Sequence, residues 1–162
     1  MLSVIAMVTK TTISAIRALS YLSRCGLDES VSPRRMAEAL GESPTYLAKV
    51  ARLLVRNGIL RAERGVKGGV RLGRAPNQIT LLAVVEACQG AIVGDYCRQD
   101  CDVATVCPYH RAALELQEAV VAVLSRWDLE RITETPQSFS PPSGRSCLIA
   151  LGPELQRSGA RP

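Results

Sequence analysis

A chain of 162 residues with a formal net charge of +5 suits one domain, or one small domain with a helical extension. Its apolar runs are far shorter than the ~20 residues of a membrane span, and no signal peptide is recognised, so we expect a cytoplasmic protein without membrane contact. In that reducing setting, six cysteines favour a metal or redox site over a disulfide framework.

The charge is divided unevenly along the chain. Residues 1–75 hold 13 Lys and Arg against 5 Asp and Glu, a net of +8, whereas residues 76–162 hold 7 against 10, a net of −3. A basic half is typical of a surface that binds a polyanion, because cations aligned with phosphates release condensed counterions. An arginine-rich helical domain without a nucleic-acid partner would have the same composition. The order of the elements has to separate the two interpretations.

Apolar residues at helical spacing predict three helices in the basic half, the first over residues 12–24. Ser32 and Ser43, each followed by proline, are start signals for two more, which end at Gly41 and Asn57. Two capped helices around a Gly-containing turn form the helix-turn-helix pattern, whose second helix enters the DNA major groove by its N-terminal residues. The alternative is a helical hairpin with solvated polar residues.

The second of these helices carries polar side chains suited to DNA. Ser43, Thr45 and Tyr46 supply hydroxyls for phosphates or base edges, and Lys49 and Arg52 supply cations.

Residues 59–63 and 70–72 then predict two short strands around a glycine-rich basic tip, which is a wing. Arg64, Lys67 and Arg71 would place positive charge along phosphates or a minor groove. The tip lacks a Gly-Lys-Ser/Thr ending and opens no helix, which argues against a nucleotide-phosphate loop.

The second half of the chain is dominated by one long helical signal, from Pro108 to Trp127. Leu116, Val120, Val123 and Trp127 form an apolar stripe, which predicts a symmetric subunit interface; the alternative is that the stripe is core of the same chain. The predicted fold class is therefore mainly α with a small β wing: a winged helix-turn-helix domain over residues 1–90 and a dimerisation helix region over residues 108–135. Residues 136–162 are expected to form a disordered tail.

Three cysteines and a histidine, Cys97, Cys101, Cys107 and His110, fall within fourteen residues of a loop-like segment, residues 91–110. Thiolates and imidazole are ligands of zinc and of iron–sulfur clusters. Because Pro108 suits a first helical turn, Cys107 would cap that helix and His110 would lie on the same face. Structural zinc, an iron–sulfur cluster and a metal-free thiol–disulfide pair remain open. With one histidine and no nucleophile–base pair, we expect no enzyme.

Helix, helix-turn-helix, wing and cysteine loop in this order resemble the Rrf2 family of winged-helix bacterial transcription regulators. The resemblance is carried by Thr45-Tyr46-Leu47, by Asn-Gly-Ile-Leu at residues 57–60 and by Arg-Gly-Val-Lys-Gly-Gly-Val-Arg-Leu at residues 64–72, and it extends from Val8 to about Thr135. It implies a homodimeric regulator that binds a palindromic double-stranded operator and senses iron, redox state or nitric oxide through an iron–sulfur cluster in the cysteine loop.

Carried over to this chain, the cluster ligands are Cys97, Cys101 and Cys107. The family's usual loop has five residues in each gap, whereas this chain has three and then five, so a two-iron and a four-iron cluster both stay open. Relatives take the fourth ligand either from a histidine shortly after the third cysteine, which His110 matches, or from the partner subunit's first helix. An acid of the loop is a further option: Asp95, Asp100 or Asp102. Cys25, Cys88 and Cys147 are given no ligand role.

Overall fold

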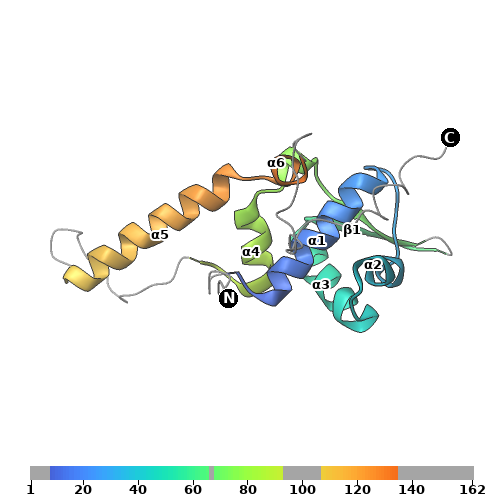
Figure 1. The fold of residues 1–162 in the computed structure, drawn as a ribbon, viewed down its shortest axis with the longest axis horizontal. Coiled ribbons are helices and arrows are strands. Elements are labelled where there is room, and N and C mark those ends of the chain that lie inside the picture. Colours follow the sequence, from blue (N-terminus) through green and yellow to red (C-terminus); the bar gives the residue numbers. More distant parts are fainter. Residues whose placement is uncertain (1–7, 66–67, 93–106, 135–162) are drawn as a thin grey trace, which may run out of the picture.

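The computed structural model describes residues 8–65, 68–92 and 107–134. Its elements are α1 (Lys10–Cys25), α2 (Pro33–Leu40), α3 (Pro44–Arg56), β1 (Leu60–Glu63), β2 (Gly69–Leu72), the 3-10 helix η1 (Pro76–Gln78), α4 (Leu81–Gln89), α5 (Pro108–Arg126) and α6 (Leu129–Thr133). The prediction of a mainly helical chain with a small β wing is confirmed (Figure 1). Among the described helices, none combines the length and apolar character needed to cross a bilayer.

Side-chain caps explain where the first helices begin. α1 starts at Lys10, two residues before the predicted start, because the Thr9 hydroxyl accepts a hydrogen bond from the Thr12 backbone N–H (3.3 Å). The Ser32 hydroxyl caps α2 in the same way, and Gly41 ends α2 in the left-handed conformation (φ 66°), which favours glycine. These residues set where α1 and α2 begin and where α2 ends.

The core lies between α1, α2, α3, α4 and the sheet. Leu19, Leu22, Met36, Leu47 and Leu54 are its largest contributors from α1, α2 and α3, and each is fully buried. Because apolar residues recur at helical spacing in each helix, each turns one stripe inward and leaves the opposite face to solvent. α3 is thereby held with a polar face outward.

The wing is an antiparallel pair of strands anchored to the start of α2. β1 and β2 pair in register from Leu60 opposite Leu72 to Glu63 opposite Gly69. On the edge of β2 away from β1, Val31 and Val70 exchange two backbone hydrogen bonds (3.0 and 2.9 Å). A Cβ at Gly69 would lie 2.5 Å from the Val31 carbonyl, so this close approach requires glycine.

The chain returns from α5 to the winged domain through a junction that the sequence analysis did not predict. α5 ends at Arg126, close to the expected Trp127, and the short helix α6 follows. The Leu81 N–H donates to the Trp127 carbonyl (2.8 Å) and the Leu129 N–H donates to the Ile79 carbonyl (2.9 Å). The Trp127 carbonyl and the Leu129 N–H therefore pair with the winged domain and not within one continuous helix. The Leu129 side chain is buried in the core.

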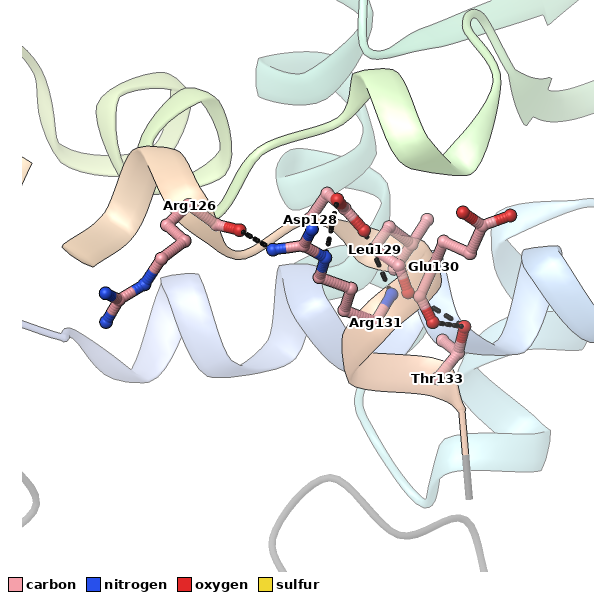
Figure 2. A network of polar contacts seen from close by, with 6 residues as sticks. All are labelled: Arg126, Asp128, Leu129, Glu130, Arg131 and Thr133. Carbon is pink, nitrogen blue, oxygen red and sulfur yellow. Dashed lines mark hydrogen bonds and ion pairs between the residues drawn. The ribbon is translucent and has the colours of Figure 1, made fainter. Parts of the chain in front are cut away.

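Polar contacts within the junction join the end of α5 to the start of α6 (Figure 2). The Asp128 carboxylate caps α6 by accepting from the Arg131 backbone N–H (2.9 Å). The Arg131 guanidinium donates to the Arg126 carbonyl at the end of α5 (2.7 Å). α5 itself extends away from the winged domain, so this junction is one of its attachments to the rest of the chain (Figure 1).

Candidate nucleic-acid interface and cysteine site

The outer face of α3 presents a row of polar and cationic side chains. Thr45, Lys49, Arg52 and Arg56 follow one another at steps of four, three and four residues, which places them on one side of a helix. All four are exposed, as is Ser43 at the N-cap. The opposite side is buried, so packing of the core points this row outward.

Tyr46 is placed differently from its neighbours on α3. It is half-buried against the core, and its hydroxyl donates a hydrogen bond to the Thr11 hydroxyl on α1 (3.3 Å). The Lys10 ammonium lies 5.9 Å from the centre of the Tyr46 ring, within range of a cation–π interaction. In this conformation Tyr46 joins α3 to α1 and does not stand in the exposed row.

The predicted cations of the wing differ in exposure and in ion pairing. Arg64 is exposed directly after β1, whereas the Arg71 guanidinium donates to the Glu63 carboxylate across the sheet. Glu63 therefore offsets part of the Arg71 charge. Lys67 lies outside the described residues.

Two further exposed cations extend this surface and were missed in the sequence analysis. Arg56 continues the α3 row four residues after Arg52, and that spacing was visible in the sequence. Arg61 lies on β1 of the wing, where its side chain is exposed. Strand alternation alone could not assign Arg61 to the outer face, because all three residues from Arg61 to Glu63 are exposed.

Cys107 and His110 lie at the start of α5, as the sequence predicts. Cys107 is the exposed N-cap residue, its side chain makes no capping hydrogen bond, and the half-exposed His110 follows within the first turn. Helix N-termini favour anionic groups, because their first N–H groups have no helical partner. A thiolate-ligated metal centre, which is electron-rich, fits this position.

The remaining predicted ligands lie outside the described residues: Cys97, Cys101, Asp95, Asp100 and Asp102. Within the ranges that the structure describes, no three His, Cys, Asp or Glu side chains come together as a metal site.

Cys25 and Cys88 differ from Cys107 in their surroundings. Both are partly buried against the core, and desolvation is the largest cause that raises the pKa of each thiol. The Cys88 thiol also contacts the Thr11 carbonyl (4.0 Å). A raised pKa keeps a thiol protonated at neutral pH, and only the thiolate binds metals well, which agrees with giving neither residue a ligand role.

Comparison with known proteins decides the family. Residues 8–135 match the Rrf2 family, described as "Iron-dependent Transcriptional regulator". The chain belongs to this family. Protein aau3 of Rhizobium meliloti (strain 1021) is 31% identical to this Rrf2 regulator in an alignment of 130 residues that covers 78% of this chain and 84% of that protein.

Two solved structures show the same fold. CymR (YrzC), the global cysteine regulator of B. subtilis, superposes with a TM-score of 0.64 at 22% identity, covering 82% of this chain and 97% of CymR. IscR of T. potens superposes with a TM-score of 0.59 at 22% identity, covering 77% and 84%. Family membership makes this chain a winged-helix, DNA-binding transcription regulator and not an enzyme, as the sequence predicts.

The α5 helix gives this Rrf2 regulator a third distinctive surface. Tyr109, Leu116 and Val123 are spaced seven residues apart, which aligns them on one face, and they are 75, 62 and 47% exposed. Trp127, also exposed, extends the line. No residue of α5 is buried in the described part of the chain, so the alternative that its stripe is intrachain core is not supported there.

Proposed function

We propose that this Rrf2 regulator binds a palindromic double-stranded operator as a homodimer in the cytoplasm, with residues 1–90 forming the DNA-binding domain. The observation that carries the proposal is the exposed row of Thr45, Lys49, Arg52 and Arg56 on α3, the second helix of the helix-turn-helix. In this motif the start of the second helix enters the major groove. Thr45 and Lys49 are therefore proposed to reach base edges, and Arg52 and Arg56 to contact phosphates.

The wing is proposed to contact the backbone beside the major groove. Arg61 and Arg64 are exposed on and after β1, and Lys67 and Arg71 are assigned to the same surface from the sequence. Glycines around the tip let a backbone approach closely, and the cations attract phosphate. Wing contacts of this kind position the protein on DNA and contribute affinity more than sequence specificity.

The exposed line on α5 supports dimer formation through residues 108–135. A two-fold axis along such a line pairs each apolar side chain with the same surface of a second copy. The spacing of the two α3 helices then sets the spacing of the two operator half-sites.

We further propose that residues 91–110 hold an iron–sulfur cluster through Cys97, Cys101 and Cys107, with His110, a loop acid or a partner-subunit residue as the fourth ligand. Such a cluster supplies an iron centre that reacts to iron supply, oxidants or nitric oxide. Cys107 is the N-cap residue of α5, and the loop follows α4, so in chain order the proposed ligands come after the DNA-binding domain and up to the start of the dimer helix. A change at Cys107 therefore acts at the start of the helix that carries the proposed interface.

Binding titrations with the Lys49→Ala variant test the proposed DNA surface. Removing this exposed cation should weaken binding to a duplex selected by the wild-type protein from a random library by about tenfold, because a phosphate or base contact is lost. Arg126→Ala is the matched control, since Arg126 is an exposed cation at the C-terminal end of α5, outside the proposed DNA surface. Equal affinity for wild type and Lys49→Ala would reject α3 as the DNA-binding helix.

A metal-free thiol sensor is the second candidate. It is favoured by the exposure of Cys107 and by the likeness in fold to CymR, a global cysteine regulator. Metal analysis and a visible spectrum of anaerobically purified protein separate the candidates: an iron–sulfur cluster is coloured, zinc is colourless, and a thiol pair holds no metal. In the iron case, His110→Ala should alter the spectrum if His110 is the fourth ligand.

A further inference from the structure

A charged cluster lies inside the contact between α1 and the turn of the helix-turn-helix. The Arg17 guanidinium donates to the Glu42 carboxylate (Nη1 to Oε1, 3.0 Å) and to the Leu40 carbonyl (Nη2 to O, 2.9 Å). The Ser14 hydroxyl donates to the same Glu42 oxygen (3.0 Å). One carboxylate on the turn is therefore held by two side chains of α1.

The cluster is largely shielded from water. The Glu42 and Arg17 side chains are 12 and 27% exposed, and Ser14 is buried. Arg17 Nε and Glu42 Oε2 are also buried, without a hydrogen-bond partner among the described residues. Placing an ion pair in such surroundings costs desolvation that apolar side chains would avoid, so stability alone does not explain it.

The position of the cluster suggests what it does. Leu40 is the last residue of α2, Gly41 ends that helix in the left-handed conformation, and Ser43 is the N-cap of α3. The Ser43 side chain makes no capping hydrogen bond, so its own cap does not lock the first turn of α3. The Arg17 guanidinium thus bonds both the last residue of α2, Leu40, and the residue before the α3 N-cap, Glu42. A planar guanidinium fixes the geometry of its partners better than the point charge of a lysine does.

We propose that Arg17 and Glu42 are positioning residues that set the direction in which α3 leaves the turn, and thereby operator specificity, without contacting DNA. The inference rests on the proposed role of α3 in DNA binding. A recognition helix tilted in its groove loses base contacts, whereas general attraction between cations and phosphates survives. The pair is therefore expected to act on discrimination between sequences.

Binding measurements with two duplexes test this role. One duplex is selected by the wild-type protein from a random palindromic library, and the other is a scrambled sequence of equal length. Arg17→Met and Glu42→Gln should each weaken binding to the selected duplex about tenfold or more, a loss within the range of a mismatched base contact. Binding to the scrambled duplex and its salt dependence should stay within about twofold, because the cations of α3 are unchanged.

A double variant distinguishes the proposed positioning role from instability of the single variants. Arg17→Met with Glu42→Leu removes both charges, so thermal unfolding should occur at or above the wild-type temperature, as for other buried pairs replaced by apolar residues. The ratio of its affinities for the selected and the scrambled duplex should nevertheless be smaller than that of the wild-type protein. A stable double variant with the full wild-type preference would overturn the proposal.

The two proposals fail in different ways. If Lys49→Ala weakens binding while the Arg17 and Glu42 variants keep the wild-type preference, α3 binds DNA and the positioning role is refuted. If Lys49→Ala has no effect either, the DNA surface itself is wrong. Equal loss on both duplexes in the Arg17 and Glu42 variants would indicate general damage and also refute the positioning role.

Discussion

The described cysteines of this regulator differ mainly in their access to water. Cys107 is exposed at the start of α5, whereas Cys25 and Cys88 pack against the core with pKa values raised by burial. A raised pKa means less thiolate at a given pH, and the thiolate is the species that binds metals and reacts with alkylating agents. Solvent access therefore separates a candidate ligand from structural thiols.

Alkylation rates test this separation in a variant without Cys97, Cys101 and Cys147. At pH 8 we expect iodoacetamide to modify Cys107 about ten times faster than Cys25 or Cys88, because protonation and burial both slow the latter two. Peptide mass spectrometry over time measures the three rates, and urea-unfolded protein is the control in which the rates should converge. Modification of Cys88 as fast as Cys107 in the folded protein would contradict the burial argument.

At the scale of elements, the junction between α5 and α6 links the dimer helix to the winged domain. Asp128 caps α6, and Leu129 enters the core beside it. Asp128→Ala should lower the free energy of unfolding by about 1 kcal/mol, the usual cost of losing a side-chain cap. Glu130→Ala is the control, because Glu130 lies two residues after Asp128 and is exposed, and it should change stability little. Equal effects in chemical denaturation would show that the Asp128 cap contributes nothing.

Local signals in the sequence predicted most elements of the fold. Each helix start and end depends on residues within one or two helical turns of it. Examples are Ser32 and Ser43 before proline, Gly41 after α2 and the periodic apolar residues. The junction was missed because its hydrogen bonds join Ile79 and Leu81 to Leu129 and Trp127, which lie 50 and 46 positions later. The Arg17 and Glu42 contact joins residues 25 positions apart, and no spacing rule connects them.

The candidate DNA surface was predicted where local spacing decides a side chain's position, and missed where another element decides it. Lys49 and Arg52 follow from helical periodicity, whereas the half-buried position of Tyr46 depends on Thr11, which lies on another helix. The Arg71 partner was also out of reach, because cross-strand pairing with Glu63 depends on the wing register. The assignments of Cys97 and Cys101 remain predictions.

For the whole molecule, dimer formation through α5 should control operator binding. Leu116→Glu places a charge on the exposed apolar line, so we expect dissociation into monomers and a loss of operator affinity of at least about tenfold, since one half-site is lost. Ala122→Glu adds the same charge at an exposed position about 120° around the helix from Leu116 and should leave the dimer intact. Sedimentation velocity gives the mass of each variant, and a dimeric Leu116→Glu protein would contradict this interface.

Coupling between the cysteine loop and α3 is the central claim for the molecule as a sensor. The most direct test is an anaerobic titration of the selected duplex with protein as purified and with the same protein after removal of its metal by a chelator. We expect the two dissociation constants to differ by about 5- to 150-fold, the usual range of allosteric coupling, and the difference to vanish in Cys107→Ala. Identical dissociation constants for the two wild-type forms would contradict the claim.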